Sequence, residues 1–175
     1  MIDSREESLE YFWYALYVKP RHEFKVLDRL TRAGIETFLP CIDRLRRWKD
    51  RKKLITFPLF PGYIFIHIRR IPSDIIKVLR TDGVIRFIGF EPRNPERVPD
   101  EQIYSLKKIM ESGEGIDPYP YLREGRKVII KRGPLTGAEG ILIKKKDTHL
   151  FVVSIDILRR SVSVKIDASD IEAIE

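Results

Sequence analysis

The segment Pro58-Leu59-Phe60-Pro61-Gly62-Tyr63-Ile64-Phe65-Ile66 decides the fold of the N-terminal part of this 175-residue chain. Residues 62–68 are mainly aromatic and β-branched, which predicts a core strand. Because proline lacks a backbone N–H, the two prolines that bracket Leu59-Phe60 exclude that pair from the middle of a sheet. We therefore expect a bent shelf that displays apolar rings. The alternative is that Phe60 and Tyr63 are ordinary core residues.

Strands and helices alternate on both sides of this segment. Aromatic and aliphatic residues predict a strand over residues 13–18. Pro20 is expected to open a helix whose apolar stripe includes Leu27 and Leu30, and Gly34 to close it. This interleaving favours a sheet with helices packed on it. The remaining expected elements are strands over 35–39 and 84–90, a short helix from Pro72, and a helix over 99–112.

Residues 42–57 are expected to form an extended basic hairpin with its turn at Lys49 to Lys52. Seven cations occur within ten residues, and Asp50 is the one acid among them. Alternate side chains of a strand share a face, so several cations would project together and neutralise phosphates. Trp48 could stack on an exposed base; a solvated hairpin without a partner is the alternative. The cations are Arg44, Arg46, Arg47, Lys49, Arg51, Lys52 and Lys53.

The character of the sequence changes at residues 113–122, where Gly113, Gly115, Pro118 and Pro120 indicate a linker. Beyond it, apolar residues recur at every second position from Val128 to Ile166, and a last strand is expected near residues 170–174. Several short strands in about 50 residues favour a small closed barrel, because closure removes exposed strand edges. The loop over residues 131–140 reads as a tight barrel turn in which Gly140 permits close backbone approach.

The expected organisation is a disordered lead-in over residues 1–10, a mixed domain over 11–112, a linker over 113–122 and a barrel over 123–175. The net charge of +7 points weakly toward polyanionic partners. A single cysteine, Cys41, excludes an internal disulfide and suggests a reducing, cytoplasmic setting. We expect neither a membrane-spanning segment nor a signal peptide.

Catalytic chemistry has little support in the sequence. The three histidines, His22, His67 and His149, are widely separated, and Cys41 follows Pro40 at the end of a strand. No glycine-rich phosphate loop and no outstanding pair of carboxylates is present. We therefore expect no catalytic residues, no metal and no cofactor, and a binding protein rather than an enzyme.

Taken together, these features resemble the NusG family of transcription elongation and antitermination factors, from about residue 11 to the end of the chain. The N-terminal part looks like the NusG N-terminal domain, and the C-terminal part looks like a KOW domain. Phe60-Pro61-Gly62-Tyr63 followed by a linker and a KOW motif is the specific combination. The other landmarks are Trp13-Tyr14, Gly83-Val84, Phe87-Ile88-Gly89, Val128-Ile129-Ile130, Gly133-Pro134-Leu135, Gly137 and Gly140.

The resemblance implies an α+β fold: an antiparallel sheet flanked by helices, followed by a small SH3-like β-barrel. It implies a factor that binds RNA polymerase and suppresses pausing and termination without making or breaking a bond. The segments 14–23, 48–53 and 58–61 look more like the specialised, operon-specific paralogues UpxY, LoaP and RfaH. The alternatives are a general NusG elongation factor, or a KOW-type RNA-binding protein that acts without polymerase. We expect the barrel to be constitutive rather than stored as a helical hairpin.

The resemblance also implies three sets of contact residues. The clamp of the largest polymerase subunit would be bound by Tyr17, Phe60, Pro61, Tyr63 and Phe87. Non-template DNA or nascent RNA would be bound by the seven hairpin cations together with Lys19, Arg21 and Arg80. A ribosomal protein or Rho would dock on Ile157, Leu158, Arg159 and Arg160. At this last place a phenylalanine-glycine-arginine of the family is replaced by Leu158-Arg159-Arg160, which puts both partners in doubt.

Overall fold

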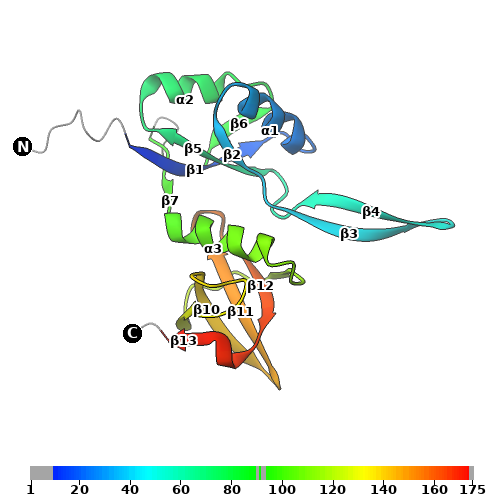
Figure 1. Ribbon diagram of the computed structural model, residues 1–175. Coiled ribbons are helices and arrows are strands. Elements are labelled where there is room, and N and C mark those ends of the chain that lie inside the picture. Colours follow the sequence, from blue (N-terminus) through cyan, green and yellow to red (C-terminus); the bar gives the residue numbers. More distant parts are fainter. Residues whose placement is uncertain (1–9, 90, 92–93, 174–175) are drawn as a thin grey trace, which may run out of the picture. The chain divides into compact units, whose positions relative to one another are not determined.

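A computed structural model describes residues 10–89, 91 and 94–173. The chain divides into two compact units, Met1–Arg97 and Val98–Glu175, called the first and the second unit below (Figure 1). The expected lead-in lies outside the described residues except for its last residue. No described helix is both long and apolar enough to cross a membrane.

The first unit is built on an antiparallel sheet with the strand order β2-β5-β1-β6. The expected strands are present, and the strand expected over 84–90 has its regular part at residues 84–87. The chain leaves this unit through β7 (Arg97–Val98). The bounds of the other strands are Tyr11–Val18 for β1, Glu36–Phe38 for β2, Tyr63–Arg69 for β5 and Val84–Phe87 for β6.

The core of the first unit lies between the sheet and the helices α1 (Glu23–Arg32) and α2 (Pro72–Leu79) (Figure 1). Side chains alternate between the faces of a strand, so every second residue of β1 and β5 points toward the helices. The other set of residues faces away from both helices. The buried core includes Tyr14, Leu16, Val18, Val26, Leu30, Ile64, Ile66, Ile68, Ile75, Val78 and Phe87.

Helix α1 begins at Glu23, three residues after the proline that was expected to open it. The reason is Arg21, whose φ of 64° is left-handed and cannot belong to a right-handed helix. Pro20 instead lies in the turn between β1 and α1. The other end agrees with the prediction, because Gly34 follows the C-cap with a φ of 79°.

A separate two-stranded ribbon, the basic hairpin, extends from the first unit away from its sheet (Figure 1). It consists of β3 (Cys41–Trp48) and β4 (Arg51–Pro58), paired along their whole length. The turn contains only Lys49 and Asp50, so it is tighter than the expected turn over 49–52, and Lys49 has a φ of 44°.

The second unit contains a six-stranded antiparallel sheet with the order β13-β9-β10-β11-β12-β8. The expected period of two is seen in β9, where Val128 and Ile130 are buried, but residues 151–153 and 161–164 are buried at consecutive positions. Gly140 is required at a close approach, because a Cβ there would lie 2.5 Å from the Val152 carbonyl oxygen. The elements are β8 (Asp117–Tyr119), β9 (Arg126–Ile130), β10 (Glu139–Lys145), β11 (Thr148–Ile155), η1 (Asp156–Leu158), β12 (Arg160–Ile166), η2 (Ala168–Asp170) and β13 (Ile171–Ala173).

The boundary between the compact units lies earlier than the expected domain boundary. Helix α3 (Asp100–Glu111), expected at the end of the first domain, falls in the second unit. Ser105 Oγ accepts a hydrogen bond from the Glu139 backbone N–H at 2.8 Å, and Gln102 Nε2 donates one to Asp156 Oδ2 at 2.9 Å. Strand β8 lies within the segment expected to be a linker. It pairs only with β12 among the described residues, and such an edge position tolerates Pro118.

Candidate functional site

The turn that follows β4 is held in one conformation by backbone contacts on three sides. The Leu59 N–H donates to the Pro40 carbonyl, the Tyr63 N–H to the Phe60 carbonyl, and the Val18 N–H to the Gly62 carbonyl. Gly62 has a φ of 86°, and a Cβ there would lie 3.1 Å from the Tyr17 ring. The backbone conformation therefore favours glycine, and an added Cβ would also require a small shift of the Tyr17 ring. We call residues 60–63 the ring turn.

The acceptor for the Gly62 N–H of the ring turn is a residue that the sequence did not single out. Glu23 Oε1 accepts a hydrogen bond from the Gly62 N–H at 2.9 Å, and Glu23 is buried at 6% exposure. Its place in the first turn of α1 also suits a negative charge, since the helix N-terminus is partly positive. The available signal was a single acid at the start of an amphipathic helix, which does not reveal a partner 39 residues away.

The aromatic rings near this turn lie on the face of the sheet that points away from α1 and α2. Tyr17 and Tyr63 are directly opposite each other in register, with ring centroids 5.6 Å apart. Phe60 packs edge-on against Phe65 with centroids 6.4 Å apart, and it is 4% exposed. Tyr17 and Tyr63 are partly exposed, and Pro61 is exposed. The accessible surface at the ring turn and the end of β1 therefore consists of two tyrosines and a proline, whereas Phe60 is buried against Phe65.

Phe87, which the resemblance implied as a further contact residue, lies on the opposite face of the sheet. It pairs with Leu16, is 3% exposed and packs edge-on against Tyr14 with ring centroids 6.1 Å apart. Its environment is the core between the sheet and the helices. Of the five implied contact residues, Tyr17, Pro61 and Tyr63 are therefore the accessible ones.

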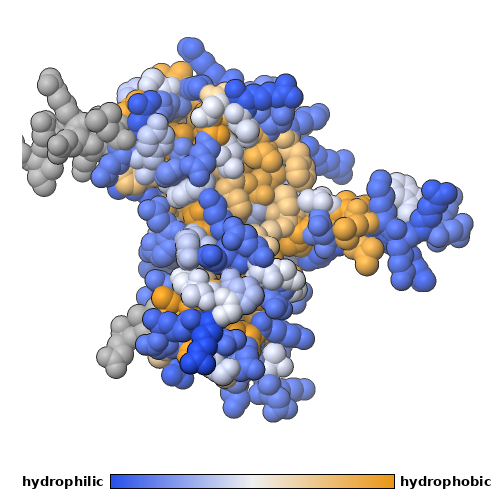
Figure 2. All heavy atoms as spheres, in the orientation of Figure 1, coloured by the Kyte–Doolittle hydropathy of each residue, from blue (hydrophilic) through white to orange (hydrophobic). Residues whose placement is uncertain are grey.

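The basic hairpin has two different faces, set by its register. One face carries Trp48 opposite Arg51 and Arg46 opposite Lys53. The other carries Arg47 opposite Lys52 and, nearer the base, the exposed pair Leu45 and Leu54. Trp48 is 69% exposed beside the turn. In Figure 2 the hairpin is hydrophilic toward its tip and hydrophobic nearer its base.

Within the described part of the chain, none of the seven hairpin cations forms an ion pair. Arg46 lies over the Phe57 ring at 4.9 Å, which holds its guanidinium without neutralising it. Asp43, the acid nearest the base, accepts a hydrogen bond from the Thr56 hydroxyl instead. Arg47 and Lys52 are like charges placed directly opposite each other, which is unfavourable without an anionic partner.

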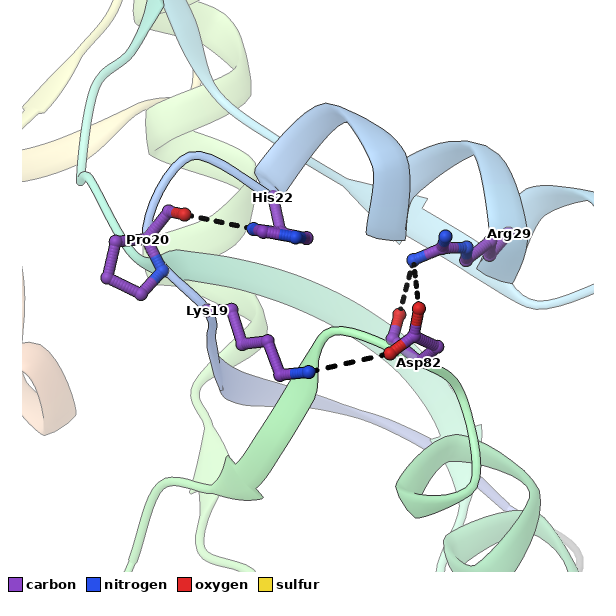
Figure 3. Close-up of polar contacts among 5 residues, drawn as sticks. All are labelled: Lys19, Pro20, His22, Arg29 and Asp82. Atoms are coloured by element: carbon purple, nitrogen blue, oxygen red, sulfur yellow. Dashed lines mark hydrogen bonds and ion pairs between the residues drawn. The ribbon is translucent and has the colours of Figure 1, made fainter.

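Among the cations expected outside the hairpin, Lys19 lies in a cluster of ion pairs around Asp82 (Figure 3). Lys19 Nζ lies 3.5 Å from Asp82 Oδ1, and Arg29 Nη1 lies 3.2 Å from Asp82 Oδ2. The charge of Lys19 is therefore partly offset within the fold. Arg21 is exposed in the turn before α1, and Arg80 is exposed at the C-cap of α2. Cations without an ion-pair partner among the described residues are therefore more closely spaced in the basic hairpin than at Lys19, Arg21 and Arg80.

Cys41 lies at the base of the hairpin and does not have the environment of a reactive thiol. Burial raises its pKa, and the negative charges of Asp43 and Glu23 raise it further. The described residues contain no cluster of three or more histidine, cysteine or acidic side chains placed to hold a metal ion.

The expected docking loop of the second unit spans η1 and the start of β12. Leu158 is buried, whereas Arg159 and Arg160 are exposed, and Arg159 has a φ of 48°. Asp156, at the start of this loop, accepts hydrogen bonds from the Gln102 amide and the Tyr121 hydroxyl, both at 2.9 Å. The two arginines are thus presented by a loop fixed from within the second unit.

The first unit thus combines an antiparallel sheet, the ring turn and a basic hairpin whose cations form no ion pairs among the described residues, and a small β-rich second unit follows it. The family model described as "Transcription termination factor nusG" matches residues 11–107, more than half of the chain. The protein belongs to the NusG family, a family of transcription termination and antitermination factors rather than enzymes.

Two full-length relatives and one solved structure show how far the similarity extends. The NusG proteins of Buchnera aphidicola and Staphylococcus carnosus are 23% and 25% identical, and each comparison covers 91% of this chain and 94% of the relative. The structure "Domain interaction in Thermotoga maritima NusG" aligns with a TM-score of 0.51 at 20% identity, covering 96% of this chain and 99% of that one. This last likeness supports the fold.

Proposed function

We propose that this protein is a specialised antitermination factor that binds RNA polymerase and suppresses pausing and termination on a restricted set of operons. The observation that supports this most directly is the basic hairpin. Seven cations without ion-pair partners among the described residues project from the unit that also presents the ring turn. One unit could therefore bind a protein and a nucleic acid together.

The ring turn is the proposed polymerase contact, with the clamp helices of the largest subunit as the partner. Pro61 and Tyr63 of the ring turn, together with Tyr17 of the neighbouring strand β1, offer accessible apolar surface, and the backbone of the turn is already ordered. Fully burying one such aromatic side chain contributes about 1.5–3 kcal/mol, and rigid aromatic residues are frequent hot spots. Binding that favours the closed clamp over the open one would favour the active polymerase state.

The hairpin is the proposed contact with non-template DNA or nascent RNA. An eight-residue strand spans about 26 Å, so the tip can reach well beyond the surface of the sheet. Its cations would neutralise phosphates, and Trp48 could stack on an unpaired base. The second unit would dock a ribosomal protein or Rho through Ile157, Leu158, Arg159 and Arg160, with the two exposed arginines making the first contact.

The polymerase contact is tested by replacing Tyr17 and Tyr63 together with alanine in the full chain. We expect copurification with core RNA polymerase to fall at least tenfold, because two ring contacts are lost while the backbone of the turn is retained. Phe24→Ala is the matched control, since Phe24 is 47% exposed on α1 of the same unit. Equal recovery of polymerase with the double variant and the control would contradict the proposal.

Whether the protein acts on a few operons or on most transcription units is a separate question from whether it contacts polymerase. A general NusG elongation factor is the second candidate, favoured by similarity to general NusG proteins over 91% of this chain. Mapping the protein across transcription units in the cell distinguishes the two. Occupancy of a few long operons supports a specialised factor, and occupancy of most units supports the general one.

A further inference from the structure

The described residues include four non-glycine residues with a positive φ, and all four are basic. They are Arg21, Lys49, Lys146 and Arg159, with φ angles of 64°, 44°, 54° and 48°. Each is exposed and lies in a connection between two elements. None of them forms an ion pair within the part of the chain that the structure describes.

This residue choice is unusual for its backbone conformation. In the left-handed region the Cβ approaches the backbone, so glycine is preferred, and asparagine and aspartate are the enriched alternatives. Two-residue hairpin turns show the same preference. An observed outlier of this kind is a reason to look for a function that the charged side chain serves.

Lys146 is the member of this set that the proposed function does not include. It is the first residue of the two-residue turn between β10 and β11, and Lys144 and Lys145 precede it. Lys165 lies on β12, across β11 from these residues, where it pairs with Leu150, two residues beyond Thr148, the partner of Lys145. All four lysines are exposed, and none has an ion-pair partner among the described residues.

Fewer acids than lysines lie near this turn, so the local charge is positive. Asp147 is the second residue of the turn, and Asp167 follows β12. The Asp167 carboxylate accepts a hydrogen bond from the Ser169 N–H at 2.9 Å. Elsewhere in the second unit a lysine does find a partner, since Lys131 Nζ lies 3.5 Å from Glu172 Oε2. We call residues 144–146 the lysine turn.

The lysine turn repeats the local chemistry of the basic hairpin in a different unit. Lys49-Asp50 and Lys146-Asp147 both close a hairpin, and in both turns the lysine is left-handed. The difference is that the basic hairpin has Trp48 beside its turn, whereas residues 144–148 contain no aromatic side chain. A base-stacking role is therefore confined to the basic hairpin.

We propose that the lysine turn is a second nucleic-acid-binding element, which contacts the phosphate backbone without reading bases. Lysines act as point charges on flexible stems, which suits a line of phosphates. An acidic protein partner fits less well, because protein interfaces are depleted of lysine and have an apolar core, and the turn itself is polar. With the basic hairpin in the first unit, the protein then binds nucleic acid through both units.

The test is binding of the full chain to 30-nucleotide fluorescent probes: single-stranded DNA, single-stranded RNA and duplex DNA. Affinity is measured by anisotropy from low to high KCl. For Lys144→Gln with Lys145→Gln and Lys146→Gly, we expect the slope of log affinity against log salt to become shallower by about 2 to 3, since each phosphate contact contributes about 0.7–0.9. Lys131→Gln, at the ion-paired lysine, is the control and leaves the slope unchanged.

The single change Lys146→Gly separates a binding role from a structural one. Glycine relieves the left-handed conformation, so we expect weaker binding together with an unfolding midpoint that is unchanged or higher. Equal salt slopes for the triple variant and the native chain would overturn the proposal, and so would a lower midpoint for Lys146→Gly. The assay contains no polymerase, so its outcome is independent of the proposed polymerase contact.

Discussion

Glu23 is the residue on which the position of the ring turn depends. Its buried carboxylate is the acceptor for the Gly62 N–H, and it joins the start of α1 to a turn 39 residues later. The sequence predicted a bend at residues 58–63 because proline and glycine have strong local preferences. It did not identify Glu23, because a hydrogen bond between distant segments leaves no local pattern.

Replacing Glu23 with alanine leaves the Gly62 N–H buried without its acceptor. We expect the free energy of unfolding of the first unit to fall by about 1–3 kcal/mol. Urea denaturation followed by tryptophan fluorescence measures this, because both tryptophans of the chain, Trp13 and Trp48, lie in the first unit. Glu23→Gln keeps an acceptor oxygen and should lose less than half as much; an equal loss would show that the charge, not the hydrogen bond, is what matters.

At the scale of elements, the sequence predicted most strands and helices, but it missed β8 within the expected linker and misplaced the start of α1. The strand after the ring turn, the basic hairpin and the alternating strands of the second unit follow from clear periodicity. The start of α1 was placed at Pro20 because proline favours a first helical turn, but the left-handed Arg21 delays the helix to Glu23. No sequence preference of arginine indicates that conformation.

Gly62→Ala tests the ring turn as an element. Alanine at a φ of 86° costs about 1–2 kcal/mol in backbone strain, and its Cβ would also press on Tyr17 at 3.1 Å. Gly34→Ala is the matched control, because Gly34 has a φ of 79° and no neighbouring atom within 4 Å of the added Cβ.

We expect both variants to unfold at lower urea concentration, and only Gly62→Ala to weaken polymerase copurification. That difference would show that polymerase binding depends on the shape of the ring turn and not on the overall stability of the first unit. Equal polymerase binding by the two variants would mean that the contact tolerates a displaced Tyr17.

At the scale of the whole molecule, the feature that the sequence predicted least well was which of the two compact units contains α3. Its amphipathic pattern predicts that Ile103, Leu106, Ile109 and Met110 point inward; the first three are buried and Met110 is partly exposed. The pattern does not predict which surface buries them. The family match ends at residue 107 and so includes most of this helix, whereas the compact second unit begins at Val98. The polar contacts of Gln102 and Ser105 with the second unit agree with the compact division.

Ser105→Ala tests that division, because it removes the acceptor of the Glu139 backbone N–H. We expect the second unit to lose about 1–3 kcal/mol of stability while the first unit is unaffected. Far-ultraviolet circular dichroism, which reports both units, should show an earlier transition, and tryptophan fluorescence, which reports the first unit, should not change. A shift of both signals to the same extent would show that the two units unfold as one.

The basic hairpin ends in a two-residue turn, and side chains alternate between the faces of its strands. A change in the length of the hairpin therefore keeps the same side chains on each face only if each strand gains or loses an even number of residues. One residue added to each strand moves the turn by one pair, so that the residues beside it change faces. Two residues added to each strand keep both faces in phase and advance the tip by about 7 Å. The reach of such a hairpin can therefore change in steps of two residues per strand, with the aromatic and basic side chains still on their own faces. Under the proposed function, each step would let the tip meet a nearer or a more distant nucleic-acid strand.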